Sequence, residues 1–458
     1  MKVLLVTPSH PHTPTRWIPV GIAYLASSLI AKGHDVRVYD RHRKDFIFGN
    51  KDQLNSDFKS EIISYSPDII GFSTVSPVIY DTVEAVEYIR TFYDKTIVAG
   101  GHHATALPME TLSKIPGLDF VIAGEGEKTL AALADDCSAE KLPGLFTRKT
   151  NPAGFTNARI DALDALPFPD YSFFDMDFYT KANAYTIRGR YLKIAEVLSS
   201  RGCTNNCSFC SETLTYGRGV RFHSPGYVIE CIERLLADYD INAIYFHDND
   251  FLISRKHAEE ICRLLISKGL SKKIKWAVQA GTDKADDDIL RFMSEAGCTA
   301  IEFGMESIKE SDLETINKNR LVELNERAIS LCNKNGISVH SYFMTGLPGE
   351  TLDDLNALLS WIKKHQPHSF SLSSLMMHPG TALYADHGND FFANNEWSKK
   401  NITSYYESNP LCDMDNESFR TWKKEVLIPF SSRHHRKWML RNNTSLSLMK
   451  MLCNKILD

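Results

Sequence analysis

The stretch YLKIAEVLSSRGCTNNCSFC, residues 191–210, joins a strand-like run to a loop that carries three cysteines. The run YLKIAEVLSS predicts a β-strand, and Cys203, Cys207 and Cys210 follow in the loop directly after it. Thiolates at these spacings can wrap one face of a cubane cluster, because sulfur donors suit iron–sulfur clusters or zinc. Three ligands for four irons leave one iron open. The loop is therefore a candidate site for an open 4Fe-4S cluster.

Zinc is the main alternative ligand for these cysteines, since it also takes thiolates. Structural zinc is closed by four ligands, and no second cysteine pair stands nearby in the sequence. His223 could be recruited as the fourth ligand, so the alternative stays open, although the spacing favours the iron–sulfur cluster.

Strand and helix patterns continue to alternate after the cysteine loop. Five further strands are expected, each paired with a helix: AIYFHDND, IKWAVQAG, AIEFGMES, SVHSYFMTG and SFSLSSLM. Six strand and helix units in a row predict a parallel β/α barrel, complete or partial, over residues 191–387. Barrel enzymes place their chemistry at the carboxyl ends of the strands, and the cysteine loop follows the first strand.

The residues before this barrel show the same alternation. Five apolar strands with intervening helices predict a doubly wound parallel sheet over residues 1–137: KVLLVT, DVRVYD, PDIIGFSTVS, TIVAGGH and DFVIAGEG. In such sheets, ligands lie outside the carboxyl ends of the strands. Residues 138–190 read as an ordered connector, and residues 388–458 as a small, mostly helical region without an assigned role.

The composition limits the classes of partner. The chain has 458 residues, long enough for two or three domains, and 52 Lys and Arg stand against 57 Asp and Glu, a net charge of −5. No overall basic field is present, so nucleic acid is not expected as a partner. The sequence shows neither a secretory leader nor an apolar run long enough for a membrane span, so we expect a cytoplasmic protein with reduced cysteines.

The cysteine motif carries a family resemblance. Its CxxxCxxC spacing after the first barrel strand, with the aromatic Phe209 before the third cysteine, resembles the radical S-adenosylmethionine (SAM) superfamily. The resemblance implies that the open iron binds the amino and carboxylate groups of SAM, with Phe209 among the cofactor contacts. One electron, from a donor such as flavodoxin or ferredoxin, would then cleave the sulfonium bond and yield a 5′-deoxyadenosyl radical.

The same resemblance places SAM contacts at the ends of later barrel strands. Gln279 and Glu306 would hydrogen-bond the ribose or the methionine part of SAM. Lys318 would hold the carboxylate, although Arg320 could serve and a solvated helix charge would look the same. Gly346, in GLPGE, would let the backbone approach the adenine, and a simple turn is its alternative.

Polar side chains also end the second barrel strand. His247, Asp248 and Asp250 point by periodicity toward the barrel mouth, where they are candidates for substrate binding. Capping of the next helix is an equally good reading for some of them. The sequence leaves the choice open.

The N-terminal sheet carries a second resemblance, which runs from residue 1 to about residue 385. The phrases IPVGIAYLASSLIAKGHDV, DIIGFSTVS, VAGGHHATALP and DFVIAGEGEKTLAAL, followed by LPFPDY, resemble cobalamin-dependent radical SAM enzymes. The loops at the strand ends would contact the corrin ring and its nucleotide tail, and the loop from Ser73 to Tyr80 would lie near the cobalt. The expected cobalamin contacts are Thr7, Ser73, Thr74, Gly100, Gly101, Gly124 and Glu125.

One motif of many cobalamin folds is missing from this sheet. The DxHxxG motif, which supplies a histidine to the cobalt, is absent: Asp40 and His42 match its first letters, but they follow the second strand and position 45 is Asp. His10 and His12 lie on the first loop, where a histidine is more often a surface residue than a ligand. The resemblance thus implies a cobalt without a histidine below it. An empty cobalamin fold is the alternative.

Together the two resemblances imply a methyltransferase that acts on an unactivated carbon, or phosphorus, of a small metabolite or peptide. One SAM molecule would methylate the cobalt, and a second would give the radical that activates the substrate. The alternative is a radical cyclisation, ring contraction or oxidation without methyl transfer, with cobalamin as helper or absent. A non-catalytic carrier of metal or cobalamin is disfavoured by the complete set of cysteines with Gln279, Glu306 and Lys318.

Overall fold

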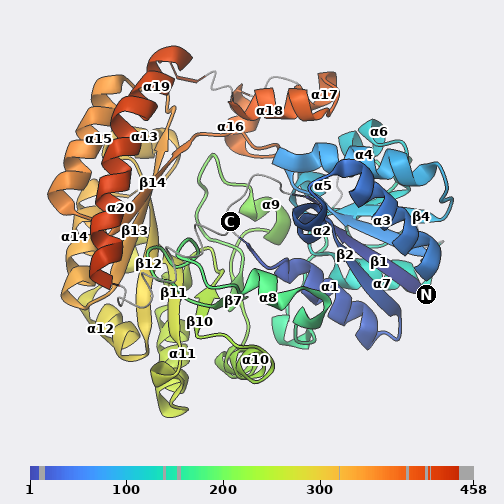
Figure 1. Cartoon of the computed structure of the whole chain (residues 1–458), viewed down its shortest axis with the longest axis horizontal. Coiled ribbons are helices and arrows are strands. Elements are labelled where there is room, and N and C mark those ends of the chain that lie inside the picture. Colours follow the sequence, from blue (N-terminus) through green and yellow to red (C-terminus); the bar gives the residue numbers. More distant parts are fainter. Residues whose placement is uncertain are drawn as a thin grey trace. The chain divides into compact units, whose positions relative to one another are not determined.

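The computed structural model describes residues 1–9, 16–137, 141–151, 156–318, 320–387, 391–407, 411–412 and 414–442 (Figure 1). His10, His12 and Cys453 lie outside these residues. The described chain forms two compact units: residues 1–179, 202–221 and 376–407 make the first, and residues 180–201, 222–375 and those from 411 onward make the second. The domain boundaries expected from the sequence stay predictions.

A six-stranded sheet forms the core of the first unit, in the order β2-β1-β3-β4-β5-β6. The strands β1 to β5 are parallel, and β6 pairs antiparallel with β5. Their bounds are β1 (Lys2–Thr7), β2 (Asp35–Asp40), β3 (Ile69–Ser73), β4 (Thr96–Gly100), β5 (Phe120–Ile122) and β6 (Leu145–Phe146). The predicted doubly wound parallel sheet is confirmed, with β6 as an added edge strand.

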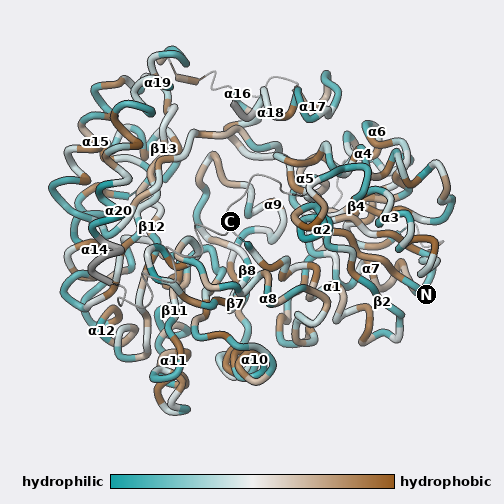
Figure 2. Tube along the Cα trace, viewed as in Figure 1, coloured by the Kyte–Doolittle hydropathy of each residue, from teal (hydrophilic) through white to brown (hydrophobic). Residues whose placement is uncertain are grey.

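Helices cover both faces of this sheet. The helices α1 (Val20–Ala31) and α7 (Gly126–Asp135) pack together on one face, and α3 (Lys51–Tyr65) packs beside α4 (Ile79–Arg90) on the other (Figure 1). Shorter helices lie at the strand ends: α2 (Arg41–Phe48), α5 (His102–Ala106) and α6 (Pro108–Lys114). The strand β1 shows why the sheet forms here, because Val3 to Val6 are at most 1% exposed. Figure 2 shows this apolar character along the strands.

The first unit also holds segments from later in the chain. Short helices follow the sheet: α8 (Met176–Tyr179), α9 (Glu212–Tyr216), α16 (Ala382–His387), α17 (Phe391–Asn394) and α18 (Lys399–Glu407). The helix α9 belongs to the cysteine loop. This loop therefore packs with the N-terminal sheet, although in the sequence it follows the first barrel strand.

A second parallel sheet forms the second unit, in the order β14-β13-β12-β11-β10-β7. Its strands are β7 (Ile194–Val197), β10 (Ala243–Phe246), β11 (Lys275–Ala280), β12 (Cys298–Glu306), β13 (Ser338–Thr345) and β14 (Ser369–Ser374). The connecting helices include α10 (Pro225–Asp238), α11 (Arg255–Ser267), α12 (Asp287–Glu295), α13 (Glu310–Thr315), α14 (Val322–Lys334) and α15 (Leu352–His365). Neighbours in sequence are neighbours in the sheet, and its edge strands β7 and β14 are not paired with each other. The barrel predicted from the sequence is thus a partial one.

The C-terminal helices cover the open edge of this partial barrel. The helix α19 (Asn416–Trp422) leads through a π-helical turn (Lys423–Leu427) into α20 (Ile428–Asn442), which packs on β14. The backbone N–H of Phe370 donates to Nε2 of His435 at 3.2 Å, and the ring of His434 contacts the carbonyl of Pro367 at 2.6 Å. Edge strands expose backbone groups that need partners, and the helix supplies them. The structure thereby gives a role to part of a region that the sequence left unassigned.

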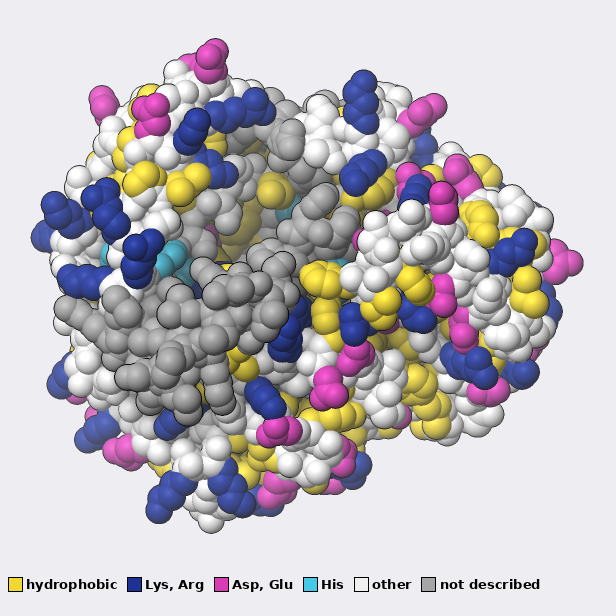
Figure 3. Space-filling view, in the orientation of Figure 1, with side chains coloured by type: hydrophobic (Ala, Val, Ile, Leu, Met, Phe, Trp, Pro, Cys, Tyr) yellow, Lys and Arg dark blue, Asp and Glu magenta, His cyan; other side chains and the backbone are white. Residues whose placement is uncertain are grey.

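Charged side chains of both signs are mixed on the surface. Figure 3 shows lysine and arginine side chains interspersed with aspartate and glutamate over the described part of the visible face. Among the described residues, no helix combines the length and the apolar character needed to cross a membrane.

The half-buried His368 and His435 and the buried His340, all packed at β14, predict a loss of stability in mild acid. Burial lowers the pKa of His368 and of His435 to about 4, and that of His340 well below its usual value. An unfolded histidine titrates near 6.5, so between about pH 6.5 and pH 4 the unfolded chain binds more protons than the folded one. Stability therefore falls as the pH drops through this window, by on the order of 1 kcal/mol per histidine.

Urea unfolding of the full chain at pH 7.5 and at pH 5 measures this effect. We expect a lower midpoint at pH 5 and a shallower pH dependence for His435→Gln, whose amide still offers an acceptor to Phe370. The matched control is His247→Gln, because His247 is exposed and its loss should leave the pH dependence unchanged. Equal pH dependence in the wild type and in His435→Gln would contradict the assignment.

Candidate functional site

The cysteine loop is closed at its base by its own backbone. Cys203 forms a bridge with Arg218, and the N–H of Cys210 donates to the carbonyl of Cys207 at 3.2 Å. Gly202 has a φ of +96°, and a Cβ there would lie 2.3 Å from the carbonyl oxygen of Gly219. Only glycine fits this crossing of the two loop strands. The three cysteines therefore lie on a segment whose ends are held together.

The thiol groups have the chemistry that a sulfur-ligated cluster needs. All three predicted ligands are half-buried, and burial raises the pKa of Cys210 to about 12. A thiolate in such surroundings needs positive charge beside it, which iron supplies. Within the described ranges, no three His, Cys, Asp or Glu side chains are arranged as a ready metal site. The donor set fits the cluster by its chemistry, and the ligand role of these cysteines stays a prediction.

A buried ion pair anchors the cysteine loop to the sheet of the first unit. Arg221, at the end of the loop, donates from Nη1 to Oε2 of Glu125 at 2.5 Å, and the two side chains are 8% and 1% exposed. The same guanidinium donates to the carbonyl of Ile160, whose N–H donates to Glu125 at 2.8 Å. Glu125 follows β5, so the loop is fixed at the carboxyl end of that strand.

A second contact joins the loop to β4. Oγ1 of Thr215 in α9 lies 3.0 Å from Nδ1 of His102, which begins α5 directly after β4. The loop that holds the candidate cluster ligands thus contacts two of the strand-end loops predicted to bind cobalamin, those after β4 and β5. Neither contact could be predicted from the sequence, because both join residues about 100 positions apart.

The glycines predicted for cobalamin are explained by the chain itself. Gly101 has a φ of +93°, and a Cβ there would lie 2.7 Å from the carbonyl oxygen of Thr74. Gly124 has a φ of +91°, and its Cβ would lie 2.3 Å from that of Ala158. A side chain at either place would clash with backbone, whatever is bound nearby. Gly100 has more room, since its Cβ would be 3.4 Å from the nearest atom.

The predicted polar contacts of cobalamin also have partners within the unit. Thr7 donates to Oδ1 of Asp40 at 2.9 Å, and Thr74 donates to the carbonyl of Gly100 at 2.7 Å while it accepts from the N–H of Ala104. Ser73 is half-buried at the end of β3. The structure brings these loops to one edge of the sheet, and their contacts with cobalamin stay predictions.

In the second unit the structure joins two of the predicted SAM contacts. Nζ of Lys318 lies 2.6 Å from Oε1 of Glu306, and the two side chains are 11% and 10% exposed. Lys318 is therefore not a solvated helix charge. Glu306 ends β12 with a φ of +62°, a strained backbone that persists only where its surroundings fix it. Arg320, the alternative to Lys318, pairs instead with Asp283 at 3.1 Å.

The other two barrel positions lie at strand ends. The N–H of Gly346 and the hydroxyl of Thr345 both donate to Oε2 of Glu350, at 2.5 and 2.7 Å. Burial raises the pKa of Glu350, and these hydrogen bonds oppose it. Gly346 thus begins a compact turn. Gln279 lies half-buried near the end of β11.

The two aspartates among the substrate candidates have structural roles of their own. Asp248 is 1% exposed and accepts from the N–H and the hydroxyl of Ser199 at 3.2 and 2.9 Å, and burial raises its pKa to about 6. Asp250 pairs with Lys284 at 2.8 Å and caps the 3₁₀ helix η4 (Phe251–Ile253). His247 is exposed at the end of β10. Capping, left open by the sequence, thus applies to Asp250.

The sequence reasoning missed a polar row inside the barrel. Oε2 of Glu302 accepts from the hydroxyl of Tyr342 at 2.5 Å and from that of Tyr245 at 3.0 Å. Burial raises the pKa of Glu302, while the two hydroxyls and the charge of Arg188 lower it. A signal was present in the sequence, because Glu302 interrupts an apolar strand, where an ionisable residue needs a partner.

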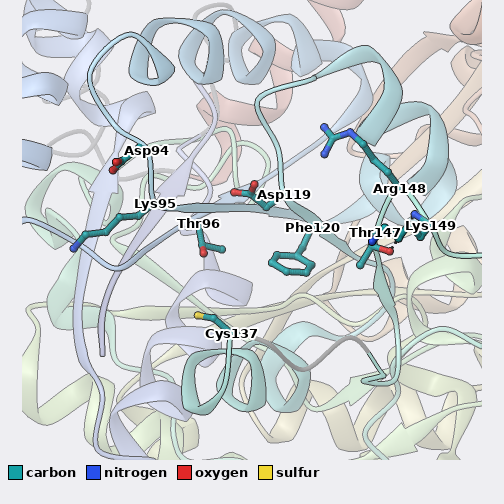
Figure 4. Close-up of a pocket in the computed structure, with 9 residues that line it drawn as sticks. All are labelled: Asp94, Lys95, Thr96, Asp119, Phe120, Cys137, Thr147, Arg148 and Lys149. Atoms are coloured by element: carbon teal, nitrogen blue, oxygen red, sulfur yellow. Dashed lines mark hydrogen bonds between the residues drawn. The ribbon is translucent and has the colours of Figure 1, made fainter.

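A cavity at the opposite edge of the first sheet can be set aside. An open depression of about 450 Å³ lies at the start of β4 and β5, and Figure 4 shows the side chains around it. It is lined by Asp94, Lys95, Thr96, Asp119, Phe120, Cys137, Thr147, Arg148 and Lys149. Thr96 and Phe120 are the first residues of their strands, so this depression is remote from the carboxyl-end loops.

Comparisons with known proteins address both units. The family model of the radical SAM superfamily matches residues 197–362, and that of the B12 binding domain matches residues 12–134. An uncharacterized methyltransferase of Pyrococcus horikoshii is 30% identical over 84% of this chain and 82% of its own length. An anaerobic magnesium-protoporphyrin IX monomethyl ester cyclase of Cereibacter sphaeroides is 27% identical over 84% of this chain and 63% of its own length.

A solved structure shares the fold. The radical SAM methyltransferase TsrM of Kitasatospora setae, with tryptophan and a SAM analogue bound, has a TM-score of 0.69 and 20% identity. The match covers 85% of this chain and 75% of that chain.

The ion pair at the cysteine loop gives a test of its anchoring role. Arg221→Met leaves Glu125 buried without its cation, which costs about 3–5 kcal/mol, so we expect a lower unfolding midpoint in urea. The loop cysteines should also react faster with a thiol reagent. The control Arg37→Met breaks an exposed pair with Glu61, 2.9 Å apart, and should change little. Equal effects of the two variants would contradict the anchoring role.

Proposed function

The chain belongs to the cobalamin-dependent radical SAM enzymes, and on that premise we propose that it is a methyltransferase that acts on an unactivated carbon or phosphorus of a small metabolite or peptide. One observation carries the proposal. Both family models match this chain, and a relative named as a methyltransferase aligns with it over most of the length of each protein. The cofactors of this family are a 4Fe-4S cluster, SAM and cobalamin.

The first unit would hold two of these groups close together. Cys203, Cys207 and Cys210 would ligate the cluster, and the loops after β1, β3, β4 and β5 would bind cobalamin. When bound, the cluster with SAM supplies a carbon radical and cobalamin supplies the methyl group. The contacts of Arg221 with Glu125 and of Thr215 with His102 support this arrangement, because they fix the cysteine loop on the cobalamin loops.

The second unit would bind SAM at its strand ends. Glu306 would accept from the amino group or the ribose, and Lys318, held 2.6 Å from it, would attract the carboxylate. Gly346 and Gln279 would complete the contacts. The left-handed backbone of Glu306 supports a functional role, since strained residues gather at such sites.

The reaction needs partners from outside the chain. We propose a low-potential electron donor such as flavodoxin or ferredoxin, a small-molecule or peptide substrate, and a cytoplasmic location. The loop after β10, which carries His247, Asp248 and Asp250, is our candidate for substrate contacts.

A second candidate is a radical cyclisation or oxidation without methyl transfer. The cyclase relative favours it, although that relative is less similar and only 63% of it is covered. In that case the same cysteines and barrel would generate the radical, while cobalamin would serve another role.

The cysteines provide the first test of the proposal. In a triple variant, Cys203→Ala, Cys207→Ala and Cys210→Ala, iron should be lost and SAM should no longer be cleaved to 5′-deoxyadenosine under dithionite. Cobalt should be retained, because the cobalamin loops are unchanged. The matched control replaces three buried cysteines of the barrel helices α10, α11 and α14, Cys231, Cys262 and Cys332, with alanine. Continued cleavage by the first variant would refute the cluster assignment.

Labelled SAM separates the two candidate functions without a known substrate. Reconstituted protein loaded with reduced cobalamin is incubated with SAM that carries a trideuterated methyl group, and the cobalamin is then extracted for mass spectrometry. We expect a labelled methyl group on the extracted cobalamin. An unlabelled cobalamin, together with 5′-deoxyadenosine production, would instead support the cyclisation or oxidation.

A further inference from the structure

Two exposed arginines lie against the cysteine loop of the first unit. Arg218 belongs to the loop itself, where its backbone forms the bridge with Cys203. Its Nη2 lies 3.4 Å from Oδ1 of Asn206, which stands between the first two cysteines of the loop. Arg159 contacts the loop from earlier in the chain, because its Nη1 donates to the carbonyl of Arg218 at 3.1 Å and to that of Tyr216 at 3.4 Å. Positive charge is thus held at the surface beside the predicted cluster ligands.

This positive charge is only partly balanced by the chain. Nε of Arg159 lies 3.3 Å from Oδ1 of Asp161, but that carboxylate is 89% exposed, so water weakens the pair. Arg218 forms no ion pair with any residue that the structure describes, and its contact with Asn206 is with a neutral amide. The full charge of Arg218 is therefore available at the surface.

A neighbouring arginine of the same loop shows the contrast. Arg221 is buried and paired with Glu125, so its charge holds the loop on the first unit. The exposed charge of Arg218 has no such structural partner among the described residues. An exposed charge of this kind acts mainly on what approaches from solution, because it attracts opposite charge and raises the rate of encounter.

We propose that Arg218 and Arg159 form the docking surface of the electron donor, a small carrier protein with an acidic surface around its redox group. The inference rests on the proposed function and deepens it by naming where that donor binds. One electron passes from the reduced carrier to the cluster, so the carrier is oxidised, the cluster is reduced and no atom is transferred. The position suits this step, since electron transfer slows steeply with distance and these arginines flank the loop that would hold the cluster.

Charge variants of Arg218 test this surface in the reconstituted full chain. Arg218→Glu reverses the charge, and Arg218→Lys keeps it. The control Lys32→Glu makes the same change of net charge at the exposed end of α1, just before the amino end of β2. The rate of 5′-deoxyadenosine formation from SAM is measured with two reductants: reduced flavodoxin, an acidic carrier, at concentrations where reduction limits the rate, and the methyl viologen radical, a small cation.

With flavodoxin, we expect Arg218→Glu to be about fivefold slower than the wild type at low salt, and Arg218→Lys and Lys32→Glu to stay within about twofold. The wild-type rate should fall as the ionic strength rises from about 0.05 to 0.3 M, because salt screens the attraction. The rate of Arg218→Glu should fall less. With methyl viologen, Arg218→Glu should be no slower than the wild type, since its negative charge attracts the cation.

Other results would overturn the docking role. Slowing of Arg218→Glu with both reductants would mean damage to the cluster or the fold, and equal slowing in Lys32→Glu would reduce the effect to net charge. An unchanged flavodoxin rate in Arg218→Glu, or a wild type that is reduced by methyl viologen but not by flavodoxin, would also contradict it. A wild type that fails to cleave SAM even with methyl viologen would refute the proposed function itself, together with the inference that rests on it.

Discussion

The first unit depends on the buried ion pair of Arg221 and Glu125. If the guanidinium moved away, the carboxylate would remain buried without a partner, which is strongly destabilising. The pair joins the end of the cysteine loop to the end of β5, and the contact of Thr215 with His102 does the same for β4. The loops proposed for the cluster and for cobalamin are therefore built as one body. Chemistry that needs two cofactors at a fixed separation depends on such rigidity.

A second ion pair with little solvent exposure lies at the strand ends of the barrel. Lys318 and Glu306 neutralise each other where little water can reach them, and Glu306 is held in a backbone conformation that an unsupported chain would leave. A zwitterionic ligand group offers both signs of charge. Such a ligand could replace this internal pair with two external ones and leave no charge unpaired.

The apolar strands of both sheets were predictable from sequence, because strands covered on two faces read as continuous apolar runs. The two-residue strand β6 was not, since so short a run has no pattern. The spacing of Cys203, Cys207 and Cys210 pointed to the cluster, but their packing with the first unit depends on partners about 100 residues away. Gly101 and Gly124 were predicted as cobalamin contacts, and that role stays a prediction; the structure shows that neighbouring backbone leaves no room for a side chain at either place. The role of Glu302 was overlooked because the pattern of apolar and polar residues along one strand does not show which side chains of other strands lie beside it.

The path of the chain between the two units bears on how such enzymes can be recombined. Residues 202–221 and 376–407 belong to the first unit, while their sequence neighbours belong to the second. The chain therefore passes between the units several times, and a cut at any one linker would separate neither. An exchange of the N-terminal domain between relatives would have to carry these two inserted segments with it. In evolutionary terms, the cysteine loop and the sheet that anchors it would be inherited together, whereas the barrel could diversify its strand ends for new substrates.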